Sequence, residues 1–153
     1  MAYSGTIKKL TTQPCFLATL ANNLTNVTGD GTQYNIIFDT STLDQTSSYS
    51  TSNGAFTAPI TGNYLFVSTI KIANLGVAHT SAIFRLTNTT RNYRAFNLNP
   101  VIIMVSNTLA LSMYAIMRMN RNDTTQSQII VSNSTKTVTV ESGNSFFSGC
   151  LLC

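Results

Sequence analysis

Apolar and polar residues alternate along much of this chain, and the alternation predicts short β-strands. The clearest case is 63–73, where two sets of side chains would point to opposite sides of a strand. One set is Tyr64, Phe66, Ser68, Ile70 and Ile72, and the other is Leu65, Val67, Thr69 and Lys71. Because both sets are largely apolar, we expect both sides of this strand to be covered, by a second sheet or by another chain.

Shorter stretches with the same character predict most of the remaining strands. They lie at 15–20, 34–38, 81–86, 101–105, 128–132, 136–140 and 146–152. The run at 101–105 is continuously apolar, which is typical of a buried strand. Residues 133–135 predict a hairpin turn, whereas 22–32, 41–53 and 88–92 read as turns and polar loops.

The segment 109–119 is ambiguous between helix and strand. Its Leu, Ala and Met residues are good helix formers, yet every odd position is apolar, which is a period of two. We interpret it as a strand, or as two short strands broken near Met113. About nine strands at roughly ten-residue spacing, with no predicted helix, then indicate an all-β sandwich or jelly roll.

The composition excludes several classes of function. At 153 residues the chain is one domain, and 43% of it is apolar but only 9% charged, against about 25% charged in an average soluble domain. Five acids and one His leave few groups for catalysis. The nine basic residues are scattered, which argues against nucleic-acid binding. No apolar run is long enough to span a membrane, and no signal peptide is visible, so we expect another export route or a parent chain.

Several segments stand in a recognisable order. The most specific is Gly54-Ala-Phe-Thr-Ala-Pro-Ile-Thr-Gly-Asn-Tyr-Leu-Phe66, which lies between Asn26-Val-Thr-Gly-Asp-Gly-Thr32 and the closing Phe147-Ser-Gly-Cys-Leu-Leu152. Over about residues 15–152 the chain resembles the globular head of the complement component 1q (C1q) and tumour-necrosis-factor (TNF) superfamily, in particular its bacterial and viral members. It departs from that pattern at Cys150, where the family has Tyr, and at Asn122-Asp123, where it has Gly-Asp.

The resemblance implies a ten-stranded jelly-roll β-sandwich assembled as a homotrimer. Residues 1–14 would be a lead-in or the end of a stalk, and 15–153 the head. The family also implies that Cys15 and Cys150 are neighbours, with bonding that depends on the redox compartment. Some members bind calcium, for which Asp30, Asp39 and Asp44 are the candidate ligands. No Asp-x-Asp spacing is present, so we expect no cofactor beyond this analogy.

Each candidate for catalysis has a structural alternative. His79 lies two residues before Ser81 and could form a nucleophilic pair with it, but a loop or edge histidine is the simpler interpretation. Cys150-x-x-Cys153 is a redox or zinc half-motif, or simply two structural thiols. A carboxylate pair would have to come from residues whose positions suit turn formation: Asp30, Asp39, Asp44, Asp123 and Glu141. We therefore expect a protein that is not an enzyme.

The surplus of apolar strand faces points to self-association, because one sandwich hides only one face of each strand. The candidates for a trimer interface are Tyr64, Phe66, Tyr114, Ile116 and Phe147, each of which could instead belong to the core. The predicted function is a trimeric, non-enzymatic head of a surface appendage, such as a virion or phage fibre tip or a bacterial filament, that binds a host receptor or glycan. The alternative is a secreted signalling or pattern-recognition ligand of the TNF and C1q kind. Either places the protein on a virion or cell surface or outside the cell.

Overall fold

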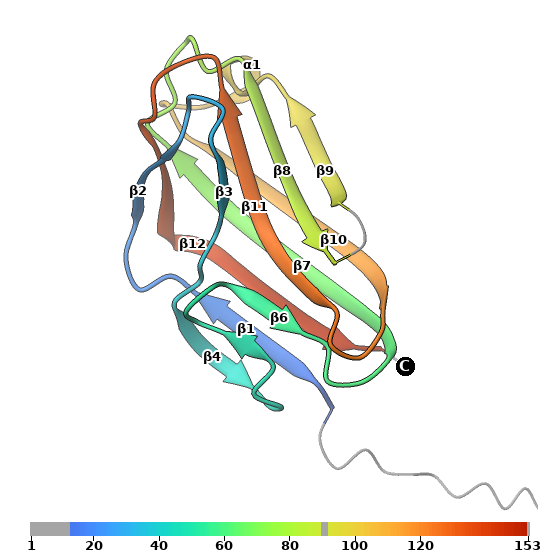
Figure 1. Ribbon diagram of the computed structural model, residues 1–153. Coiled ribbons are helices and arrows are strands. Elements are labelled where there is room, and N and C mark those ends of the chain that lie inside the picture. Colours follow the sequence, from blue (N-terminus) through green and yellow to red (C-terminus); the bar gives the residue numbers. More distant parts are fainter. Residues whose placement is uncertain (1–12, 90–91, 153) are drawn as a thin grey trace, which may run out of the picture.

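Two antiparallel sheets, each with six strands, face one another in the computed structural model (Figure 1). The structure describes residues 13–89 and 92–152, and of 92–96 it describes the backbone alone. The described residues form twelve strands and one short helix. The expectation of an all-β jelly-roll sandwich is therefore confirmed.

The first sheet, which we call sheet A, has the strand order β10-β7-β12-β1-β4, and β2 also pairs with β12. Its strands are β1 (Cys15–Thr19), β2 (Leu24–Thr28), β4 (Thr40–Asp44), β7 (Gly62–Ala73), β10 (Leu109–Met119) and β12 (Val138–Leu151). Strand β12 lies in the middle of the sheet and continues through a register shift between Glu141 and Phe146.

The second sheet, sheet B, has the order β5-β6-β11-β8-β9, and β3 also pairs with β11. Its strands are β3 (Gln33–Asn35), β5 (Tyr49–Ser50), β6 (Ala55–Thr57), β8 (Ser81–Asn88), β9 (Asn92–Leu98) and β11 (Thr124–Ser132). The helix α1 (Pro100–Ile103) lies at one end of the sandwich, in the connection between β9 and β10.

The core lies between the sheets and is rich in aromatic rings. Phe16 stacks on Tyr49 and on Phe56, with ring centroids 4.9 Å apart in both pairs. Offset and edge contacts of this kind stabilise a core beyond the area that they bury. Gly149 on β12 makes room for the cluster, because a Cβ there would come within 2.4 Å of the Phe66 ring.

Period-two alternation located the long strands correctly. Strand β7 covers the predicted 63–73 and buries alternate residues along most of its length, as expected. The strands at 15–20 and 81–86 are also present, as β1 and β8. Residues 109–119 form the single strand β10, so the strand interpretation is confirmed and no break occurs at Met113.

Short peripheral strands were missed. The predicted polar loop 41–53 contains most of β4 and all of β5, and the predicted turn region 22–32 contains β2. Strand β4 is exposed over four of its five residues and lies at the sheet edge, so no alternating apolar pattern marks it. Pairing with β1, which the local sequence does not encode, is what orders it.

Two further predictions were wrong. Residues 101–105 are not a buried strand: most of them belong to α1, and Ile102 and Val105 are 78% and 73% exposed. Pro100 suits the first helical turn, and the Asn99 side chain accepts the Val101 N–H at 3.1 Å as an N-cap. Residues 133–135 do not close a hairpin either, because β11 lies in sheet B and β12 in sheet A.

Candidate interaction face

Three rows of side chains cover the side of sheet A that faces away from sheet B. The inward residues of β7 and β10 alternate with them and are buried, which identifies these rows as the outer face. Strand register sets the rows. They are Ile116–Leu65–Cys150–Cys15, then Tyr114–Val67–Ser148–Leu17–Leu43, then Ser112–Thr69–Phe146–Thr19, which ends beside Thr40.

These rows, which we call the apolar band, contain no Asp, Glu, Lys, Arg or His. Tyr114 is 80% exposed and Ile116 is 63% exposed, although both are large and largely apolar. Charge returns only beyond the two ends of the band. Arg118 lies past Ile116, and the Lys71 ammonium pairs with the Glu141 carboxylate at 2.6 Å past Thr69. The apolar band is thus an uncharged surface that extends over five strands and carries exposed apolar side chains.

A depression of 520 Å³ opens at the edge of the apolar band, over Phe146, Thr69 and Thr19. Its wall is the stretch 142–145, where β12 carries extra residues between its pairings with Lys71 and Thr69. The wall is fixed from outside because Asn23 Oδ1 accepts the Ser142 N–H at 2.8 Å and its hydroxyl at 3.1 Å. The outer face of sheet A is therefore a shaped surface and not a flat one.

The outer face of sheet B is built differently, around Arg85 and a set of side-chain amides. The Arg85 guanidinium donates to the side-chain carbonyls of Gln128 and Gln33. Gln128 Nε2 donates to Asn35 Oδ1 at 2.5 Å, and Asn35 Nδ2 donates to Gln126 Oε1 at 3.3 Å. We call this chain of contacts the amide network. It gives the polar groups of this face partners within the protomer.

The five predicted interface residues separate into two groups. Tyr64, Phe66 and Phe147 have no exposed area and lie in the core between the sheets. Their side chains cannot contact a second copy, so the prediction that they belong to an interface is wrong. Tyr114 and Ile116 lie on the outer face of sheet A, where such a contact is open to them.

His79 lies in the β7–β8 connection, at the end of the sandwich where α1 is found. It is buried there, with 2% of its surface exposed. Its Nδ1 accepts the Gly76 N–H at 2.8 Å, so the proton is on Nε2, which lies 3.1 Å from the Thr135 carbonyl oxygen. Gly29 packs against the ring, and a Cβ at that position would lie 2.9 Å from Nε2. His79 thus holds three connections together, and both ring nitrogens already have backbone partners, so it cannot serve Ser81 as a base.

The acidic residues serve separate structural contacts and not a shared site: Asp30, Asp44 and Asp123 bind the backbone of local turns, Asp39 binds a distant loop, and Glu141 pairs with Lys71. Asp30 accepts the Thr32 N–H, and hydrogen bonds from Thr32 lower the pKa of this exposed carboxyl. Asp39 accepts the Ala21 N–H at 2.8 Å, Asp44 accepts those of Ser48 and Tyr49, and Asp123 accepts that of Asn120. Within 13–89 and 92–152, no three His, Cys, Asp or Glu residues are grouped to hold a metal ion. The proposed calcium ligands of one protomer are thus not gathered.

Buried phenols offer no activated group. Desolvation raises the pKa of Tyr34, and it raises that of Tyr49 well above the usual range despite the hydrogen bond from the Tyr49 hydroxyl to the Phe38 carbonyl at 3.1 Å. Desolvation also raises the pKa of Tyr64, whose hydroxyl donates to the Ile60 carbonyl. These phenols therefore remain protonated. Those of Tyr49 and Tyr64 act as packed, hydrogen-bonded core groups, and Tyr34 packs against the core from its edge.

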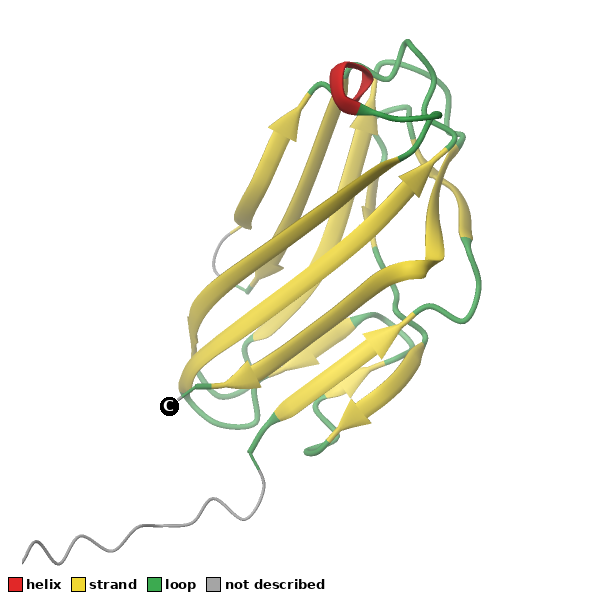
Figure 2. Cartoon of the chain, turned by 180° about the vertical axis from the view of Figure 1, so that it is seen from behind, coloured by secondary structure: helices red, strands yellow, loops and turns green. Residues whose placement is uncertain are grey.

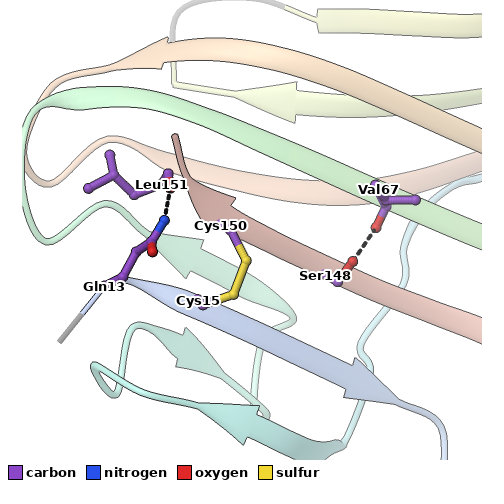
Figure 3. Close-up of a disulfide and its surroundings, with 6 residues drawn as sticks. All are labelled: Gln13, Cys15, Val67, Ser148, Cys150 and Leu151. Carbon is purple, nitrogen blue, oxygen red and sulfur yellow. Dashed lines mark hydrogen bonds between the residues drawn. A yellow bond between two sulfur atoms is a disulfide. The ribbon is translucent and has the colours of Figure 1, made fainter. Parts of the chain in front are cut away.

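Cys15 and Cys150 form a disulfide between adjacent strands (Figure 3). They are a registered pair at the start of β1 and near the end of β12. This agrees with the proximity that the family resemblance implied. Cys153, the other member of the predicted Cys-x-x-Cys motif, lies outside the described residues.

Parts of the outer faces carried no usable signal in the sequence. Leu65 and Val67 were visible as the second apolar set of their strand. Leu43 was not, because it lies in a stretch that reads as a polar loop. The amide network joins side chains from β3, β8 and β11, and no spacing along the chain brings these together.

The sequence matches the family model of the C1q domain over residues 15–152, whereas no curated protein sequence matches it. Among solved structures, the globular domain of zebrafish complement 1qA is similar, with a TM-score of 0.60 and 17% identity, over 92% of this chain and 98% of that chain. Murine APRIL at pH 8.5 is similar with a TM-score of 0.62 and 10% identity, over 92% of this chain and 99% of that chain.

A second structure of murine APRIL, at pH 8.0, has a TM-score of 0.61 and 13% identity over the same shares. At these identities the structural neighbours establish the fold alone. Within the described residues, no helix has the length and apolarity needed to cross a membrane. With the family match spanning all but the first residues and the last, this chain belongs to the C1q domain family.

Proposed function

We propose that this protein is a non-enzymatic head domain that forms a homotrimer through the outer face of sheet A and recognises a host receptor or glycan at the tip of a surface appendage. Domains of the C1q and TNF-like kind are generally non-enzymatic, usually form homotrimers and are usually extracellular or surface-exposed. This general behaviour supports the class of function. The choice of the outer face of sheet A as the interface rests on features of this chain.

The apolar band is the observation that carries the proposal. Tyr114 sits among uncharged neighbours, and Ile116 lies between Tyr114 and Arg118 at one end of the band. Both residues are largely exposed, and large exposed apolar patches mark sites of association. Interface cores are likewise depleted in charge and enriched in aromatic residues. The remaining charges, Arg118 and the Lys71–Glu141 pair, lie at the ends of the band, where an interface has its polar rim.

The position of the chain ends supports the appendage role. The start of β1 and the end of β12 lie at the same end of the sandwich, where Gln13 bonds Leu151, and α1 with the β7–β8 connection lies at the other end (Figure 2). A stalk that enters at residues 1–14 would therefore hold the α1 end outward. That end exposes hydroxyl, amide and aliphatic groups, with Val77 79% exposed, and these groups suit contacts with sugars or proteins.

Light scattering on the purified chain tests the assembly. We expect a mass about three times the 16.6 kDa of one protomer. Tyr114→Arg should reduce it to one protomer, because an arginine cannot be buried in the centre of an uncharged interface without a partner. Val77→Arg is the matched control, with equal exposure at the α1 end, and should leave the mass unchanged. A wild-type protein that stays monomeric at micromolar concentration would contradict the proposal.

Recognition needs its own measurement. Glycan arrays and pull-downs from host cell surfaces, both with the assembled protein, should show binding that substitutions at Val77 weaken. A hydrolase assay should show that the bound partner is not cleaved. Capture of a signalling receptor whose activation follows would instead favour the secreted-ligand function.

A further inference from the structure

The Cys15–Cys150 disulfide lies where the chain enters and leaves the sandwich. Cys15 is the first residue of β1, and Cys150 is the last but one of β12. The sulfurs close a loop with a sequence separation of 135. Beside them, the Leu151 N–H donates to the Pro14 carbonyl at 2.9 Å, and the Gln13 side-chain amide donates to the Leu151 carbonyl (Figure 3).

Strand β1 by itself is a weak anchor for a pulled N-terminus. It has five residues and is bordered by β12 on one side and by the exposed edge strand β4 on the other. Tension that arrives at Gln13 and is resisted at the α1 end first loads the hydrogen bonds of β1. Once these break, β1 leaves the sheet and takes Phe16 out of the aromatic core.

Strand β12 is a much stronger anchor. It has 14 residues, lies in the middle of sheet A, and pairs with β7 along most of its length as well as with β1 and β2. The disulfide joins the two strands at their first registered pair, before any hydrogen bond of β1 is loaded alone. A covalent bond does not yield at forces that break hydrogen bonds.

We propose that the Cys15–Cys150 disulfide is a mechanical clamp that transfers tension from the N-terminal segment directly into β12. This rests on the proposed role of the protein as a head held by an N-terminal stalk. The clamp also has a second effect. Tension between residues 13 and 152 passes through the two sulfurs, so it never reaches the strands from β2 to β11.

Single-molecule force spectroscopy on the whole chain tests the clamp in three pulling directions. All proteins carry Cys153→Ser to remove the third thiol, and Cys15→Ser/Cys150→Ser is compared with the bonded form. With handles at both chain ends, the bonded form should show no unfolding step. The serine variant should lengthen by about 135 residues at roughly 3.5 Å each.

With handles at the N-terminus and at Val77, the bonded form should survive about tenfold longer at constant force, since forced unfolding follows the unfolding rate. With handles at the C-terminus and at Val77, β12 is loaded directly, so the two proteins should differ by much less. Equal lifetimes in the N-terminal direction would overturn the proposal. An equal gain in both directions would also overturn it, because the bond would then stabilise the fold without routing force.

If the serine variant does not fold, reducing the bonded form with a phosphine during the pull gives the same comparison in one molecule. Because Cys15 and Cys150 belong to the apolar band, the pulls are made on single protomers, and their outcome then depends neither on trimer formation nor on a ligand. Failure of the clamp is therefore distinguishable from failure of the proposed head function.

Discussion

The outer faces of the two sheets differ in the side chains that they present. Both cover the same core, yet sheet B links its Arg85 and amide side chains into a network within the protomer. Sheet A presents the uncharged apolar band, with Tyr114 and Ile116 largely exposed. A face whose polar groups are already partnered gains little from another chain, whereas an exposed apolar face gains by being covered. The difference supports the proposal that the protomers associate through sheet A and not through sheet B.

Introducing one charge on each face should give the largest difference between them, measured as a change in the mass of the assembly. Ile116→Lys places a charge in the apolar band, and we expect sedimentation at physiological salt to show loss of the trimer, a threefold drop in mass. Ile83→Lys makes the same change on the outer face of sheet B, opposite Ile130, and should leave the mass unchanged. If Ile83→Lys dissociates the assembly and Ile116→Lys does not, the assignment of the faces is reversed.

The disulfide belongs to sheet A and has no counterpart among the described residues of sheet B. Removing it with Cys15→Ser/Cys150→Ser should lower the free energy of unfolding by about 2–5 kcal/mol, because the unfolded chain regains the freedom of a long loop. Denaturant titration under oxidising and reducing conditions measures this. The wild-type curve should shift on reduction, while that of the variant should not.

The amide network makes a smaller but specific contribution. Gln128→Leu removes one acceptor of Arg85 and the donor to Asn35, and we expect a loss of about 1–3 kcal/mol in unfolding free energy because the buried Arg85 guanidinium loses a hydrogen bond to its charged group. Gln128→Glu restores an acceptor for Arg85 and should recover part of the loss. A loss no larger than that of an exposed surface substitution would show that the network is not needed.

The equivalent change on the other face should have the smallest effect. Thr69→Val removes the contact between Thr69 Oγ1 and Ser112 Oγ at 2.9 Å in the apolar band. These hydroxyls are exposed in the protomer, so water replaces the lost partner and we expect a change within about 0.5 kcal/mol. A denaturant midpoint that moves as far as that of Gln128→Leu would remove the contrast between the faces.

The sequence predicted the parts of the fold that depend on local periodicity. Strand β10 was recognised because its odd positions are apolar. The structure places Tyr114 and Ile116, at its even positions, outside the core, where the sequence had left both interpretations open. Strand β7 shows the limit, since both of its faces are apolar. Its alternation groups Tyr64 with Phe66 but does not say which face turns inward, and this led to their assignment to an interface.

Features set by pairing between distant segments were out of reach. Strand β4 has no pattern of its own and is ordered by β1. The amide network depends on the lateral order of β3, β11 and β8. Helix α1 was missed for a different reason: the Asn99 cap and Pro100 are local signals, but the apolar run that follows them outweighed them.

His79 fixes the connections at the α1 end of the molecule from the inside. One internal imidazole ties Gly76 to Thr135 while Gly29 closes over it, so these connections are braced from beneath and not by their outward side chains. Val77, in the same connection, has no structural duty in that brace. Substitutions at the outward residues of this end should therefore leave the fold of the three connections unchanged.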